Sequence, residues 1–105
     1  MKFSLKQVAR TLMNDRDFEM EDLSSLDLSD FDFRGSNLKM TILRNSDLRG
    51  AKLSNLKISG DCSGADFRGA ILTNTKFSGA YLKDAQFDQN PLPAFSEMQL
   101  SHIKK

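Results

Sequence analysis

The chain has 105 residues, a formal net charge of +1 and a single cysteine. This length provides one small domain, the near-neutral charge excludes an overall basic field for nucleic acid, and one cysteine cannot form an internal disulfide. No segment approaches the ~18 consecutive apolar residues of a membrane span, and residues 1–15 lack the apolar core of a signal peptide. We therefore expect a soluble, cytoplasmic protein with no contact to membranes; the alternative is secretion by a route that uses no cleaved signal.

Residues 1–15 predict a short amphipathic helix. Ser4 and Gln7 have the spacing of a capping box, in which each side chain bonds the backbone of the other residue. The apolar residues that follow are spaced to share one helical face: Leu5, Val8, Leu12 and Met13. We expect this helix to cover the open end of the segment that comes next.

The segment 16–94 places an apolar residue at the centre of successive blocks of five. Such a short, regular period is typical of stacked repeats, in which each unit buries its apolar side only against its neighbours. Phenylalanine and leucine dominate the central positions, which are Phe18, Leu23, Leu28, Phe33, Leu38, Leu43, Leu48, Leu53, Ile58, Cys62, Phe67, Leu72, Phe77, Leu82, Phe87 and Leu92.

Each block alternates inward and outward residues as a strand does. The residue two positions before the centre is small in most blocks, so large and small residues alternate inside a narrow tube. Leu26, Phe31 and Leu56 break this pattern, and we expect the first coil and part of the third layer to be wider there. The fifth residue is usually Gly or Asn, which tolerate turn geometry, so each block is expected to end in a corner.

These blocks resemble the pentapeptide-repeat family, whose consensus A(D/N)LXX is matched best by SDLRG at 46–50 and ADFRG at 65–69. The resemblance implies an all-β fold, a right-handed quadrilateral parallel β-helix with four blocks in each coil. Segment 16–94 then makes about four coils, between a capping helix in 1–15 and a C-terminal segment, 95–105.

One block is a residue short, because Ile58 and Cys62 are four positions apart instead of five. The interruption predicts either a tolerated deletion at 61–64 or a bulge that shapes a binding surface. Cys62 occupies a central position, so we interpret it as a small buried core residue.

The C-terminal segment follows Pro91 and Pro93, which remove strand hydrogen-bond donors and should stop the repeat. Ser96 and Gln99 repeat the spacing of a capping box and predict a short helix. This helix is either another end cap or, as in relatives that dimerise through this end, the contact of a homodimer.

No residue pattern in the chain is typical of an enzyme. The sequence has one histidine, His102, and contains no phosphate-binding glycine loop, zinc-ligand spacing or paired serine and histidine. We therefore expect a non-catalytic protein without a cofactor or a metal.

The leading hypothesis is a protein-binding module that presents one rigid face to a protein partner. Apolar residues among outward positions, with basic residues beside them, are what such a contact uses. The candidates are Ile42, Arg44, Ile71, Tyr81 and Lys83, with Ile42 and Tyr81 expected in one column. Lys39, Lys57 and Lys76 are expected on another face as a modest basic strip.

The alternative is a DNA mimic, by resemblance to relatives that protect or inhibit DNA gyrase. Eight acidic residues and one basic residue lie between Asp15 and Asp32. The candidate acidic surface comprises Asp17, Asp22, Asp27, Asp32, Asp47 and Asp66. A DNA-handling enzyme would then be the partner, whereas direct binding of nucleic acid is not expected, because the chain is almost neutral and has few outward aromatic residues.

Overall fold

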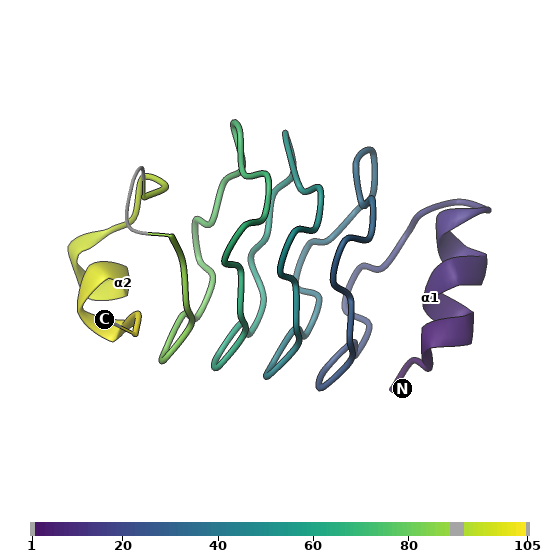
Figure 1. Ribbon diagram of the computed structural model, residues 1–105, viewed down its shortest axis with the longest axis horizontal. Coiled ribbons are helices and arrows are strands. Elements are labelled where there is room, and N and C mark those ends of the chain that lie inside the picture. The colour runs from purple at the N-terminus through teal and green to yellow at the C-terminus, as the bar shows by residue number, and fades with distance from the viewer. Residues whose placement is uncertain (1, 89–91, 105) are drawn as a thin grey trace.

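The computed structural model describes residues 2–88 and 92–104, which form a short stack of coils between two helices (Figure 1). Helix α1, Leu5–Leu12, covers the first coil, and helix α2, Glu97–His102, covers the last one. The molecule extends over 36 × 24 × 20 Å, with its two ends at opposite ends of the stack.

Parallel bridges join successive coils on all four sides. One ladder runs from Asp27 through Asp47 and Asp66 to Gln86, so the spacing is 20 residues, or 19 across the short block. The expected four-sided arrangement of about four coils is therefore present. Each bridge is a single residue pair, and no longer strand occurs among the described residues, so the sides are one-residue rungs and not the extended strands expected of an all-β sheet.

Apart from the short corner at Gly60, the described corners are β-turns with a left-handed third residue. The N–H of Ser46, for example, donates to the carbonyl of Leu43 at 3.1 Å, and Asn45 between them has a φ of 56°. A turn of this kind requires a positive φ at its third position. Gly and Asn at the fifth position do mark corners, as expected, but Met20 and Met40 also adopt the left-handed conformation.

Where an aspartate precedes a central residue, its side chain closes the turn that follows. The Oδ1 atom of Asp47 accepts a hydrogen bond from the N–H of Arg49 at 3.1 Å, and Asp61 does the same for Ser63 at 2.9 Å. An Asp or Asn side chain that bonds the backbone two residues on imitates a turn. The recurrent aspartates therefore have a structural role in every coil where this bond occurs.

The inside of the stack is filled by the central residues together with the small residues between them. The rings of Phe67 and Phe87 lie parallel at 4.8 Å, and Cys62 is fully buried, as expected. Buried hydroxyls reach the preceding coil: Thr41 Oγ1 donates to the carbonyl of Phe18 at 2.8 Å. A buried hydroxyl that is hydrogen-bonded costs little, so the narrow tube can contain Thr41, Ser46 and Thr75.

The large residues at small positions are accommodated in two ways. Leu26 and Phe31 belong to the first coil, where they are half-buried and pack against the core. The ring of Phe31 stacks against that of Phe33 at 6.0 Å. Leu56 is 5% exposed and lies inside the tube.

The short block narrows one corner around Gly60. A Cβ atom added at Gly60 would lie 2.1 Å from the carbonyl oxygen of Thr41 in the preceding coil and 2.8 Å from the backbone of Met40. Gly60 has no positive φ, unlike the glycines at the other corners. Because the missing residue draws this corner against the coil before it, only glycine fits there.

The N-terminal cap bonds and covers the edge of the first coil. Ser4 and Gln7 form the expected capping box, Val8 is fully buried, and the N–H of Phe3 donates to the carbonyl of Asp22 at 2.7 Å. Two residues of the expected apolar face are not buried: Leu5 is 42% exposed and Met13 is 89% exposed. Met13 is the C-cap residue, so it no longer follows the helical spacing.

Arg16 fastens this cap to the coil. Its Nη1 atom donates to the carbonyl of Leu12 at 2.8 Å, and its Nη2 atom donates to the carbonyl of Asp32 at 2.7 Å. A single guanidinium thus joins the end of α1 to the open edge of the stack, where unpaired backbone groups would otherwise remain.

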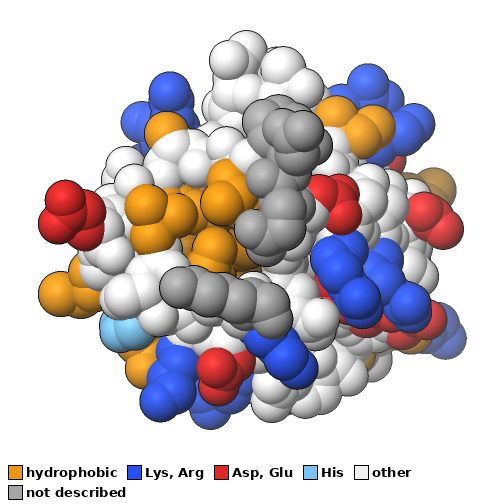
Figure 2. Space-filling view, turned by 60° about the vertical axis from the view of Figure 1, so that its left-hand side comes forward, with side chains coloured by type: hydrophobic (Ala, Val, Ile, Leu, Met, Phe, Trp, Pro, Cys, Tyr) orange, Lys and Arg blue, Asp and Glu red, His pale blue; other side chains and the backbone are white. Residues whose placement is uncertain are grey.

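The C-terminal segment closes the other end. Gln99 completes the capping box with Ser96, and its Nε2 atom donates to the carbonyls of Phe77 and Ala80 at 2.8 and 3.0 Å. Ile103 is buried, and the N–H of Asp84 donates to the carbonyl of His102. The role expected of Pro91 lies outside the described residues. Figure 2 shows hydrophobic side chains gathered at this end of the molecule.

Candidate functional site

Outward side chains form two columns on each of the four sides of the stack. The tyrosine side is the one whose bridged column contains Asp22, Ile42, Asp61 and Tyr81. Its second column contains Arg44, Ser63 and Lys83. Ile42 and Tyr81 thus share a column as predicted, with Asp61 between them.

Exposure differs among the candidate protein-binding residues on the tyrosine side. Tyr81 is 46% exposed and its ring contacts the ring of His102 edge-on at 5.7 Å, whereas Ile42 is only partly exposed. Lys83 is exposed. The Nη2 atom of Arg44 lies 2.6 Å from Oδ2 of Asp61, so this ion pair joins two coils between the two apolar residues.

Ile71 lies on a different side of the stack. Ile71 forms a parallel backbone bridge with Lys52, and Lys52 forms another with Asp32. Ile71 is 46% exposed. The five candidate residues for protein binding therefore do not form one surface: Ile42, Arg44, Tyr81 and Lys83 lie together, and Ile71 does not.

The six candidate acidic residues for DNA mimicry are spread over all four sides. Asp17, Asp22, Asp27 and Asp32 lie one on each side of the first coil, and Asp47 and Asp66 follow Asp27 in its column. These aspartates form a collar and one short column. They do not form the continuous row of charge that a DNA duplex presents.

Arginines neutralise half of these aspartates within their own turns. The pairs are Arg34 with Asp32, Arg49 with Asp47 and Arg68 with Asp66, at 2.6 to 2.7 Å. Hydrogen bonds from Arg49 lower the pKa of Asp47 below its usual value, and Arg68 does the same for Asp66. The aspartate and arginine columns therefore neutralise each other, chiefly within a coil.

Asp61 is held ionised by its neighbours. Partial burial would by itself raise the pKa of Asp61, but hydrogen bonds from the backbone of Ser63 and from Arg44 hold it below its usual value. The carboxylate is therefore a charged part of the tyrosine side at neutral pH.

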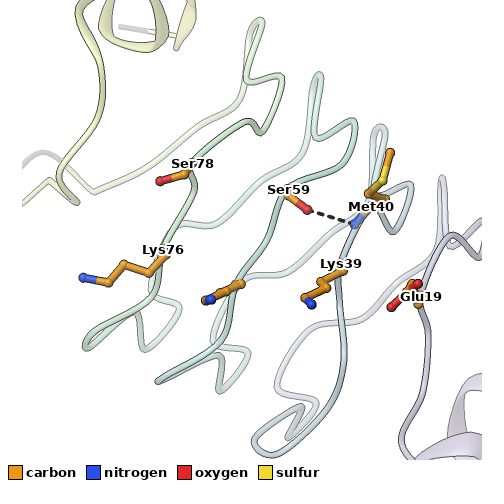
Figure 3. Close-up of a pocket in the computed structure, with 7 residues that line it drawn as sticks. Glu19, Lys39, Met40, Ser59, Lys76 and Ser78 are labelled. Atoms are coloured by element: carbon orange, nitrogen blue, oxygen red, sulfur yellow. Dashed lines mark hydrogen bonds between the residues drawn. The ribbon is translucent and has the colours of Figure 1, made fainter.

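The lysine side lies across the short corner from the tyrosine side. Its first column contains two bridged pairs, Asp17 with Asn37 and Lys57 with Lys76. Lys39 follows Glu19 in the second column. The strip expected of Lys39, Lys57 and Lys76 is thus present on one side, and the three lysines border a surface hollow of about 420 Å³ (Figure 3).

Sequence reasoning missed this hollow and its other lining residues, which are Glu19, Met40, Ser59 and Ser78. Met40 is 59% exposed at one corner, and Ser59 and Ser78 continue the lining into the next two coils. Ser59 Oγ accepts a hydrogen bond from the N–H of Met40 at 3.0 Å. The one available signal was the missing residue, because Ser59 directly precedes Gly60 at the short corner.

Groups suited to catalysis do not converge in the described part of the chain. Burial raises the pKa of the Cys62 thiol, which keeps it protonated at neutral pH. Over residues 2–88 and 92–104, no group of three or more His, Cys, Asp or Glu side chains is placed to hold a metal ion. In the same residues, no helix is both long enough and apolar enough to cross a membrane.

A family profile agrees with the repeat. The profile of the family described as Pentapeptide repeats matches residues 22–60 and 61–89 in eight copies. A pentapeptide repeat protein from Nostoc Pcc 7120, alr5209, has a crystal structure that is 24% identical in sequence. The match covers 99% of this chain and 96% of that one, with a TM-score of 0.41. A search of curated protein sequences found no match.

Proposed function

The chain belongs to the pentapeptide-repeat family, and from this we propose that it is a non-catalytic module that binds a protein partner through the tyrosine side. Members of this family are generally protein-interaction modules, and no enzyme family is indicated. The proposal depends chiefly on one observation, the exposed Tyr81 in the same column as Ile42.

The chemistry of the tyrosine side suits a protein contact. Tyrosine and arginine are enriched among the residues that dominate protein interfaces, because they combine apolar area with hydrogen bonding. Arg44 is already oriented by Asp61, so a partner would lose little side-chain entropy in meeting it. The coils that carry these side chains have a packed interior and are joined by backbone hydrogen bonds, so this side is rigid.

Capture of partners from the cells that produce the protein tests this proposal. The double variant Ile42→Asp, Tyr81→Asp should lose partners that the wild type retains. The control is Ile71→Asp, which places one negative charge on another side, at a position as exposed as Tyr81. Equal recovery by the wild type and the double variant would show that the tyrosine side is not the contact.

The DNA-mimic alternative has weaker support in the arrangement of charges. Its six aspartates surround the first coil or are paired with arginines, so no face presents an array resembling phosphates. A supercoiling assay with DNA gyrase addresses it directly. We expect neither inhibition nor protection from a gyrase poison; either effect would favour mimicry over the proposed module.

Homodimer formation through the C-terminal segment is a separate proposal. Gln99 of α2 faces the last coil, whereas Met98 is 70% exposed and Leu100 is 39% exposed on either side of it. Light scattering should then give a dimer mass that Met98→Asp reduces to the monomer. A monomer at high concentration would contradict the proposal.

A further inference from the structure

The lysine side carries positive charge that the molecule does not neutralise. Among the described residues every ion pair involves an arginine, and none involves a lysine. In the described part of the chain beyond the first coil, this side contains Lys39, Lys57 and Lys76 and no acidic residue, while Glu19 of the first coil lines one end of the hollow. Glu19 is the carboxylate nearest along the column, and it accepts a hydrogen bond from Asn37 instead.

Two of these lysines are direct neighbours in the stack. Lys57 and Lys76 form a parallel bridge, so their backbones are ~4.8 Å apart. Like charges directly opposite each other destabilise a sheet. The aspartate and arginine columns avoid this repulsion by pairing, whereas the lysine side keeps it, which is the pattern of a surface prepared for an external anion.

The hollow between the lysines adds a place for an apolar group. Figure 3 shows Lys39 and Lys76 extending toward the same side of the ribbon, with Met40, Ser59 and Ser78 along the other edge of the site. Met40 offers an exposed thioether, which adapts to apolar groups of varied shape. The position of Gly60 against the preceding coil keeps the corner beside Ser59 short.

We propose that the lysine side binds an extended acidic segment of a partner protein, with an apolar side chain of that segment in the hollow. Residues on one face of an extended peptide are ~6.6 Å apart, so flanking carboxylates can reach lysines on successive coils. The inference goes beyond the contact proposed for the tyrosine side and does not depend on it. Because the two sides meet at the short corner, one partner can occupy both.

The chemistry of the lysine side favours an acidic protein segment over nucleic acid. Binding to single strands uses outward aromatic rings on which bases stack. Among the described residues the exposed aromatic side chain is Tyr81, which lies on another side. Asp17 and Glu19 close one end of the lysine side and would repel a continuing phosphate chain.

Fluorescence anisotropy with a labelled peptide tests the proposal. The probe has a central leucine with aspartates and glutamates on both sides, and it is compared with peptides that carry serine at the centre or amides in place of the acids. The wild type should bind the acidic leucine peptide, and more weakly as salt is added. The double variant Lys57→Glu, Lys76→Glu should raise the dissociation constant about tenfold or more. Each exposed charge contact changes the affinity by about 1.5- to 5-fold, and charge reversal adds repulsion.

The matched control is Lys6→Glu with Lys52→Glu, which makes the same change in net charge on α1 and on the side of Ile71. This control should bind the peptide within about twofold of the wild type. Equal weakening in both double variants would reduce the effect to net charge and overturn the proposal. So would failure of the wild type to bind, tighter binding of a labelled DNA duplex or single strand, or self-association that Lys57→Glu with Lys76→Glu abolishes.

Thermal melting provides a readout that does not depend on the probe. Lys57→Gln removes the repulsion with Lys76 and should leave the melting temperature unchanged or raise it by about 1 to 4 °C, whereas Lys52→Gln should not raise it. A clear fall in the melting temperature for Lys57→Gln alone would show that Lys57 stabilises the fold. That result would contradict the proposal that its charge is unneutralised and available for binding.

Discussion

A methyl group at Gly60 should destabilise the coil stack far more than a methyl group at another corner. In Gly60→Ala the new Cβ atom would lie 2.1 Å from the Thr41 oxygen and 2.9 Å from its carbonyl carbon. Both contacts are with backbone, which cannot rotate away as a side chain can. The carbonyl of Gly60 also accepts a hydrogen bond from the N–H of Tyr81, so neither neighbouring coil allows a simple shift.

The size of the effect follows from this overlap. The methyl group would enter by about 1 Å, and overpacking of a filled interior costs about 1 to 3 kcal/mol, here at the upper end because the neighbour is backbone. For 105 residues the entropy of unfolding is about 0.22 kcal/mol/K, so about 3 kcal/mol lowers the melting temperature by about 14 °C.

Gly35→Ala is the control for this experiment. Gly35 has a φ of 79° and no atom within 4 Å of the added Cβ, so only left-handed strain is introduced. That strain costs about 1 kcal/mol, which corresponds to about 5 °C. Circular dichroism melts of the two variants should differ by about 10 °C. Equal melting temperatures would refute the close approach at the short corner.

Two further predictions concern the charges and the C-terminal cap. Acidification should lower the melting temperature: the folded protein keeps Asp47, Asp61 and Asp66 ionised below their usual pKa, so their stabilisation is present above about pH 4 and is lost as the pH falls toward 2. A melting temperature that stays constant or rises over a calorimetric series from pH 5 to 2 would contradict this sign. Gln99→Ala should cost about 1 to 2 kcal/mol, because it removes both a helix cap and two hydrogen bonds to the last coil. Gln7→Ala loses a cap alone and should cost less in urea unfolding; equal costs would mean that the bonds from Gln99 to the coil contribute nothing.

The period of the sequence was enough to predict the stack and its columns. Apolar residues recur every fifth position, so Ile42 and Tyr81 had to meet in one column once the short block was counted. The capping boxes at Ser4 and Ser96 also follow from local spacing alone. Local rules work well here because each block contacts only its neighbours.

Features that depend on side-chain orientation could not be predicted. Arg44 pairs with Asp61 in the next coil, and the period places both residues on one side without showing which partner the guanidinium selects. Met20 and Met40 are left-handed because the stack imposes the turn on any residue type, so propensity did not identify them. The hollow on the lysine side likewise depends on how the corner at Gly60 folds inward.

The central claim, a rigid module that binds a protein through the tyrosine side, is tested most directly by crosslinking at Tyr81. A photoreactive phenylalanine analogue at this position should give a specific adduct with one protein in the producing cells. The same analogue at Ile71, equally exposed on another side, should not give it. Adducts of equal yield and identity at both positions, or none at Tyr81, would contradict the account.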